Sequence, residues 1–199
     1  AFNLDKKDYP IRDTSLIPGY TPPDGSTPEQ YLRKLTDEGL LRRYGTVTQR
    51  ERERADYELG VICSMGYAEY YLIVWDFINW SREQGIPVGP GRGSGVSSIV
   101  AYSIGITDVE PLQYDLLFER FLNPDRVSMP DFDIDFCTDR REETIEYVRN
   151  KYHPENVCQI VTFGTMAAKN SIKDVGRVMN VPYSETDRLT KIMDGKTSI

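Results

Sequence analysis

Histidine and cysteine are scarce in this sequence of 199 residues, and their scarcity excludes several kinds of site. His153 is the only histidine, which rules out within this chain a histidine-rich metal centre and a serine–histidine–aspartate triad that rests on a second histidine. Three widely spaced cysteines, Cys63, Cys137 and Cys158, form no Cys-x-x-Cys pair. An odd, unpatterned set of this kind argues against a structural zinc and indicates free thiols in a reducing cytoplasm.

Long apolar runs are also missing. No segment reaches the length of a membrane span, and the N-terminus shows no signal-peptide pattern. We therefore expect a soluble, cytoplasmic protein without a membrane partner. The chain starts at Ala1 without an initiator methionine, and its last helical pattern reaches Ile199 without a closing signal, so we expect an excised piece of a longer polypeptide.

Positive charge is in deficit. The balance of 39% hydrophobic and 28% charged residues is that of an ordinary globular domain and argues against wholesale disorder. The net charge of −7, taken alone, argues against nucleic-acid binding, because phosphate contacts need clustered lysine and arginine. A domain that holds divalent cations must carry acids, however, and the net charge does not show where the bases cluster.

Proline and glycine positions divide the chain into segments. Residues 1–27 carry several prolines and are expected to be extended, and a hydroxyl residue followed by a proline predicts a helix from about Pro28. A helical pattern covers 48–84 with a break at Gly66, and its charged Arg50–Arg54 stretch is interpreted as solvated surface. We further expect strands at 85–88, 127–136 and 157–162, and helices at 96–103, 112–122, 138–152, from 164 to a break near Pro182, and at 184–193.

Three aspartates, Asp131, Asp133 and Asp135, alternate with apolar residues. In a strand, the three acids would project to one face while the apolar residues between them face a core. Like charges on one face repel, and Mg²⁺, which prefers oxygen ligands, is the natural counter-charge. Two neighbouring carboxylates of this kind bridge two ions about 3.5–4 Å apart in enzymes of phosphoryl transfer. A solvated edge strand is the plainer alternative, although threonine or lysine would suit such a face better than three aspartates.

An Asp-x-Asp pattern alone is common, and it also begins the metal-dependent phosphatases of the haloacid dehalogenase type. That family places a buried apolar strand before its first aspartate. Here Ser128, Met129 and Pro130 precede Asp131, and a proline at this place disfavours a central strand. The phosphatase is therefore kept only as an alternative.

A second motif is rich in glycine and reads Gly-Pro-Gly-Arg-Gly-Ser-Gly over residues 89–95. Glycines permit close approach of the backbone, and N–H groups at the start of a helix bind phosphate. Arg92 adds a positive charge and Ser94 a hydroxyl group. The loop lacks the Gly-Lys-Ser/Thr of a Walker A motif and the glycine spacing of a dinucleotide site. A tight structural turn is the alternative for this loop alone, but with the downstream aspartates the layout resembles that of the polymerase-β-type nucleotidyltransferases.

Four motifs, in order along the chain, carry a more specific resemblance. They are PVGPGRGSG at 87–95, LLFERFLNP at 116–124, MPDFDIDF at 129–136 and FGTMAAK at 163–169. Together they resemble the α subunit of bacterial DNA polymerase III, the C-family of replicative polymerases, from about Met65 to Met179. The resemblance implies a DNA-directed DNA polymerase of bacterial chromosome replication, which transfers a nucleotide from a dNTP to a primer 3′-hydroxyl by two-metal catalysis.

The resemblance also implies a fold and a domain plan. The fold would be an α/β (α+β) palm of the polymerase-β-like nucleotidyltransferase kind with flanking helices, followed by a helical thumb. Residues 1–27 would be an extended linker from a preceding PHP domain, 28–162 the N-terminal part of the palm, and 163–199 the beginning of the thumb. Primer–template DNA, dNTPs and replisome subunits such as the sliding clamp are the implied partners, the clamp through regions outside this chain.

Metal ligands are implied by the position of the third motif. The resemblance makes Asp131 and Asp133 the catalytic residues and the ligands of two Mg²⁺ ions, with a third carboxylate beyond Ile199. Periodicity alone does not separate this pair from Asp133 and Asp135. Asp135 is expected to orient the ligands without binding metal itself.

Triphosphate contacts are implied by the first and second motifs. The residues assigned to the incoming nucleotide are Arg92, Gly93, Ser94 and Arg120. For Arg120, a structural ion pair with Glu119 or Asp125 explains the sequence equally well.

DNA contacts are expected from Lys169 and Lys173 of the thumb helix, although a solvated helix face explains both residues nearly as well. The resemblance places the third carboxylate and the fingers outside this sequence. A second hypothesis for the isolated chain is therefore an inactive piece that keeps only metal or nucleotide binding.

Overall fold

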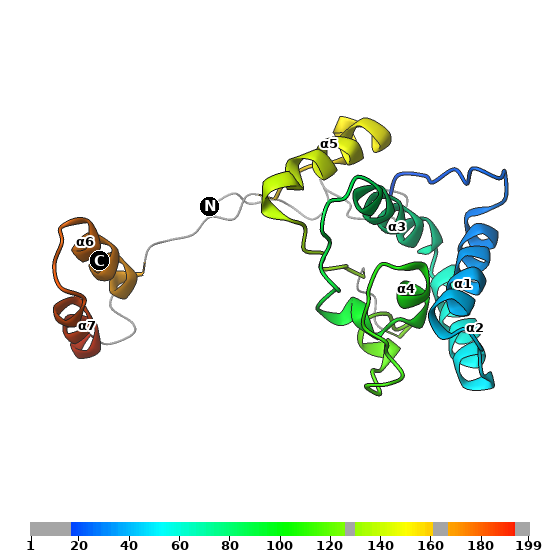
Figure 1. The fold of residues 1–199 in the computed structure, drawn as a ribbon, viewed down its shortest axis with the longest axis horizontal. Helices are drawn as coiled ribbons and strands as arrows, with labels where there is room; N and C mark the ends of the chain where they lie inside the picture. Colours follow the sequence, from blue (N-terminus) through cyan, green and yellow to red (C-terminus); the bar gives the residue numbers. More distant parts are fainter. Residues whose placement is uncertain (1–16, 126–129, 161–166, 194–199) are drawn as a thin grey trace, which may run out of the picture. The chain divides into compact units, whose positions relative to one another are not determined.

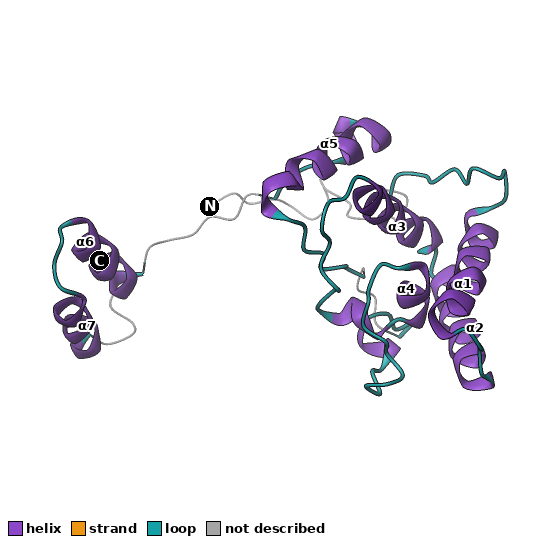
Figure 2. Ribbon diagram, viewed as in Figure 1, coloured by secondary structure: helices purple, strands orange, loops and turns teal. Residues whose placement is uncertain are grey.

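The structure, a computed structural model, describes residues 17–125, 130–160 and 167–193. The chain divides into two compact units, Ala1–Val157 and Cys158–Ile199. Helices dominate the described part of the first unit (Figures 1 and 2). They are α1 (Pro28–Tyr44), α2 (Gln49–Ser64), α3 (Ala68–Glu83), α4 (Ile99–Ile104) and α5 (Arg141–Tyr152), together with the short 3-10 helices η2 (Ser94–Ser97), η3 (Phe118–Arg120), η4 (Thr138–Arg140) and η5 (Pro154–Asn156).

The predicted start of the first helix is confirmed. Thr27 caps α1 through a reciprocal pair of hydrogen bonds: its hydroxyl oxygen accepts from the backbone N–H of Gln30 at 3.3 Å, and the Gln30 side chain accepts from the Thr27 N–H at 3.1 Å. This arrangement satisfies two donors that would otherwise be orphaned at the end of the helix.

The predicted break at Gly66 is confirmed as well. α2 ends at Ser64, α3 begins at Ala68, and Gly66 between them has a φ of +75°, a conformation that glycine adopts without strain. In the described ranges no single helix is long and apolar enough to cross a membrane, and α2 with α3 meets that test only as a pair bent by 110°.

The core of the first unit gathers around α4, against which α1 and α2 pack (Figure 1). Leu32, Ile62, Tyr71 and Val100, which come from four different helices, are fully buried. Each such side chain stabilises the fold by roughly 1.5–3 kcal/mol. α1 approaches α4 closely because Gly39 has no side chain, and a Cβ atom there would overlap the backbone of Ser103.

The α/β palm is wrong for the described ranges, which form helices and no strand (Figure 2). The expected strand at 85–88 and the glycine loop after it meet the strand expected at 127–136, which is described from Pro130 onward, only in two isolated antiparallel bridges. These bridges pair Val88 with Phe136 and Arg92 with Asp133.

Register and proline prevent a longer ladder between these two segments. Val88 and Arg92 are four residues apart, but their bridge partners Phe136 and Asp133 are only three residues apart. One residue of the loop therefore has no residue opposite it in the other segment. Pro90 has no N–H to donate, and the φ of +97° at Gly91 turns the backbone out of an extended conformation.

Two other predictions are also corrected. In place of a helix at 112–122 there are turns and the short η3, because Asp115 has a φ of +49° and Leu117 is extended, with a ψ of 119°. Of the strand predicted at 157–162, residues 157–160 are described and form no strand. The helices predicted at 96–103 and 138–152 are confirmed, as η2 with α4 and as η4 with α5.

In the second unit, α6 (Ala168–Val178) packs against α7 (Tyr183–Ile192). The predicted break near Pro182 is confirmed, since α7 begins directly after it. Gly176 permits the contact between the two helices, because a Cβ atom at this position would overlap the side chain of Thr186. The predicted palm–thumb boundary between residues 162 and 163 lies outside the described residues.

Candidate functional site

The aspartate segment keeps the predicted alternation although it is not a strand. Phe132, Ile134 and Phe136 pack against the core of the first unit, whereas Asp131 and Asp135 are exposed. The ring of Phe132 lies 4.7 Å from that of Phe121 and 5.2 Å from that of Tyr71, measured between centroids. The apolar side chains therefore anchor the segment, and its carboxylates are left at the surface.

Arg92 of the glycine loop neutralises two of the three aspartates. Its guanidinium group lies 3.4 Å from Asp133 Oδ1 (from Nη1) and 3.2 Å from Asp135 Oδ2 (from Nε). The repulsion between the acids is thus offset by an arginine of this chain. The side chains are about half exposed, so the two ion pairs contribute little to stability, at most about 1 kcal/mol each.

Glycines bring the loop against the aspartate segment. Gly93 has a φ of +71°, and a Cβ atom there would overlap the carboxylate of Asp133. A Cβ atom at Gly95 would lie 2.5 Å from the ring of Phe132. The backbone N–H of Gly89 donates to the carbonyl oxygen of Asp135 at 2.8 Å. The sequence predicted that these glycines permit close approach of the backbone. In the structure, that approach is to the aspartate segment.

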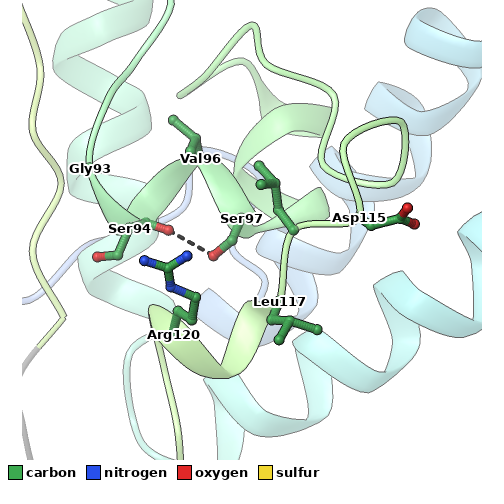
Figure 3. Close-up of a pocket in the computed structure, with 8 residues that line it drawn as sticks. Gly93, Ser94, Val96, Ser97, Asp115, Leu117 and Arg120 are labelled. Atoms are coloured by element: carbon green, nitrogen blue, oxygen red, sulfur yellow. Dashed lines mark hydrogen bonds between the residues drawn. The ribbon is translucent and has the colours of Figure 1, made fainter.

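Three of the four residues assigned to the nucleotide line one pocket of about 650 Å³ (Figure 3). Gly93 and Ser94 form one wall, and Arg120, which is 26 positions beyond Ser94 in the sequence, lies on the opposite wall. Figure 3 shows the guanidinium group of Arg120 pointing toward Ser94. The remaining lining residues are Val96, Ser97, Asp115, Leu116 and Leu117. Arg92, the fourth assigned residue, precedes Gly93 and faces the aspartates.

The alternative ion pairs of Arg120 are not formed. Glu119, which the structure describes, accepts a hydrogen bond from the Tyr57 hydroxyl at 3.0 Å, and neither Glu119 nor Asp125 pairs with Arg120. A positive charge thus faces the pocket.

The aspartates are suitable ligands for a metal ion, but in the described residues they are too few to hold one by themselves. Asp131 and Asp133 offer carboxylate oxygens, the ligands that Mg²⁺ prefers. In the part of the chain that the structure describes, however, no three histidine, cysteine, aspartate or glutamate side chains gather into a group that would hold a metal ion. The two aspartates alone would need further ligands.

The two lysines assigned to DNA lie on α6. Lys173 binds within the second unit, since its Nζ lies 3.1 Å from Asp187 Oδ1 on α7. The hydrogen bond to Asp187 raises the pKa of Lys173, and hydrogen bonds from Lys191 and then from Lys173 lower the pKa of Asp187. Lys169 is partly exposed on the first turn of the helix.

One residue of α2 near the pocket was misjudged from the sequence, and its partner was missed. Arg54 was interpreted as solvated surface, but its side chain is only 20% exposed, and it pairs with Glu58, which is fully buried. Their spacing of four residues, on one face of a helix, is the signal that would have indicated the pair.

Comparison with known proteins places the chain in a family. The family model described as the bacterial DNA polymerase III alpha NTPase domain matches residues 30–199. DNA polymerase III subunit alpha of Treponema pallidum is 58% identical over 179 residues, which cover 89% of this chain and 15% of that protein. The subunit alpha of Aquifex aeolicus is 55% identical over 184 residues, 90% of this chain and 16% of the relative. The chain thus spans about one sixth of the length of these relatives, and it belongs to the bacterial DNA polymerase III alpha family.

Proposed function

We propose that this chain forms the nucleotide-handling part of a bacterial replicative DNA polymerase that transfers a nucleotide from a dNTP to a primer 3′-hydroxyl. The observation that carries the proposal is the pocket in which Gly93 and Ser94 meet Arg120. A pocket with a serine hydroxyl, a flexible glycine backbone and an arginine suits a triphosphate, because charge-assisted hydrogen bonds to phosphate oxygens are strong.

Arg92, Gly93, Ser94 and Arg120 bind the triphosphate in this proposal. Arg92 leaves its partners Asp133 and Asp135, or shares them, when nucleotide enters. Because the side chain of Arg92 is 59% exposed and its ion pairs are weak, this change costs little free energy. The protein supplies charge and positioning, which are the main contributions in phosphoryl transfer.

Asp131 and Asp133 are the proposed ligands of two Mg²⁺ ions, with Asp135 orienting them through Arg92. Bound Mg²⁺ would supply activation of the primer hydroxyl and neutralisation of the phosphates. A third carboxylate from outside this chain completes the ligand set. Primer–template DNA, dNTPs and, through other regions, the sliding clamp are the proposed partners, with DNA phosphates contacted by Lys169 and, once freed from Asp187, by Lys173. A cytoplasmic location follows from this function.

We further propose that the 199-residue chain alone binds nucleotide without extending primers. This second function is favoured by the missing third ligand in the described ranges and by the small share of each relative that the chain covers.

Primer extension by the full-length polypeptide that contains this chain tests the polymerase proposal. Asp131→Asn and Asp133→Asn should each lower the rate by about 10²–10³, since each removes a ligand charge where phosphate charge develops. Arg120→Ala should mainly raise the KM for dNTP. The control is Asp56→Asn, which breaks an exposed ion pair between α2 and Arg33 of α1 and should change nothing.

Full activity of either Asp131→Asn or Asp133→Asn would show that the ligand assignment is wrong. Extension by the isolated 199-residue chain with Mg²⁺ and all four dNTPs would contradict the proposal that its site is incomplete.

A further inference from the structure

α2 reaches both walls of the pocket through one side chain. Arg54 Nη2 donates to the carbonyl oxygen of Ser97 at 3.1 Å and to that of Leu116 at 3.1 Å. Ser97 ends η2, the wall that contains Ser94, and Leu116 begins the segment that leads to Arg120. One guanidinium group therefore joins two segments that are distant in the sequence.

Glu58 fixes the position of Arg54 from one helical turn away. Its Oε1 accepts from Arg54 Nε at 2.7 Å, and its side chain is fully buried. The same carboxylate accepts hydrogen bonds at the start of α4, from the Ser98 hydroxyl at 2.8 Å and from the backbone N–H groups of Ile99 and Val100 at 3.1 and 3.2 Å. α4 thus holds Glu58, and Glu58 holds Arg54.

Stability alone does not account for this arrangement. Burial raises the pKa of Glu58 against the opposite effects of Arg54 and of the Ile99 N–H, which reflects the cost of placing a carboxylate inside the protein. Apolar side chains of similar volume often replace a buried ion pair without loss of stability. Apolar side chains would not, however, hold two carbonyl groups at a set separation.

We propose that Arg54, held by Glu58, is a positioning residue for nucleotide binding: it sets the distance between the Ser94 wall and the Arg120 wall of the pocket. This inference rests on the proposed function of the pocket. Arginine is required at this place because its planar group carries five N–H donors in a fixed fork, whereas lysine has a single nitrogen that does not serve Glu58 and two carbonyl oxygens together.

The test is steady-state primer extension by the full-length polypeptide with Arg54→Lys. The KM for dNTP should rise about tenfold, the loss expected for one hydrogen bond made by a charged group, while kcat stays within about threefold. A merely structural role predicts the reverse, because partial unfolding lowers the active fraction, and so the apparent kcat, without changing KM. The matched control is Arg52→Lys on the same helix, since Arg52 pairs with Asp37 and contacts neither wall.

An unchanged KM in an active Arg54→Lys enzyme overturns the inference. If that variant does not fold, Glu58→Gln decides: it keeps the shape of the side chain but removes the negative charge that holds Arg54, and KM should rise about threefold. An unchanged KM in this variant then overturns the inference instead. Absence of extension by the unaltered enzyme would contradict the proposed function itself, so the two failures are distinguishable.

Discussion

The α-carbon of Gly93 lies directly against the carboxylate of Asp133, with no room for a side chain between them. Gly93→Ala is therefore expected to displace Asp133 as well as to strain a residue whose φ is +71°. We expect an unfolding free energy lowered by about 2–3 kcal/mol, of which about 1–2 kcal/mol is backbone strain. Urea unfolding measures the loss, and nucleotide titration should show weakened binding.

Gly25→Ala is the matched control for Gly93→Ala. Gly25 has a φ of +75°, but no atom lies within 4 Å of the position of a Cβ. Its variant should show the strain alone. Equal losses of stability in the two variants would mean that the contact with Asp133 has no energetic consequence.

Gly39→Ala tests the crossing of α1 and α4. Because the added methyl group would overlap the backbone of Ser103, the helices must separate, at an expected cost of about 1–3 kcal/mol in unfolding free energy. Gly60→Ala in α2 provides the comparison, since a Cβ atom there meets nothing within 4 Å. That variant should gain about 0.5–1 kcal/mol from helix propensity. Opposite signs in thermal or urea unfolding are the expected result, and a stabilised Gly39→Ala would contradict the close crossing.

Arg92→Gln separates the electrostatic role of this arginine from its contribution to stability. Its ion pairs are about half exposed, so we expect a loss of less than about 1 kcal/mol in unfolding free energy. Binding of a Mg²⁺–dNTP complex, measured by calorimetric titration, should weaken by about tenfold, as is typical for loss of one charged hydrogen bond. Arg33→Gln removes a similarly exposed ion pair, that with Asp56, and should leave binding unchanged. Equal binding by both variants would remove Arg92 from the proposed site.

The buried phenol group of Tyr20 is expected to make the protein less stable at high pH. Burial, and then the charge of Asp76, raise the pKa of Tyr20 from 10.0 to about 12. The folded state therefore holds the phenol proton more tightly than the unfolded state does. The stabilisation is complete below pH 10.0 and is lost as the pH rises toward about 12, by on the order of 1–2 kcal/mol.

Tyr20→Phe measures this effect because phenylalanine has no proton to lose. Across the same pH range in urea unfolding, the wild-type protein should lose more stability than the variant. Tyr114→Phe, at a side chain that is 61% exposed, should follow the wild-type curve. Parallel curves for the wild type and Tyr20→Phe would refute the assignment.

Local chemistry was readable from the sequence where a feature depends on a few neighbouring residues. The cap at Thr27, the break at Gly66 and the end of a loop at Pro182 follow from single-residue preferences, and the structure has all three. The alternation of the aspartate segment also survived, because the phenylalanines on either side of Ile134 must be buried somewhere. The order of four motifs was sufficient to indicate the family, which the comparisons show.

Tertiary structure alone decided which distant segments meet. A strand needs a partner in register, and the mismatch between four steps from Val88 to Arg92 and three from Asp133 to Phe136 left the described part of the aspartate segment with two bridges and no sheet. Burial depends on the surroundings of a side chain, so the spacing of Arg54 and Glu58 could indicate their ion pair, but the sequence did not show that Arg54 is shielded from solvent beside Ser97 and Leu116. The approach of Arg120 to Ser94 likewise results from tertiary packing. The periodicity of a sequence shows which face of a helix or strand is apolar. Packing in three dimensions determines which residues that face and the opposite polar face contact.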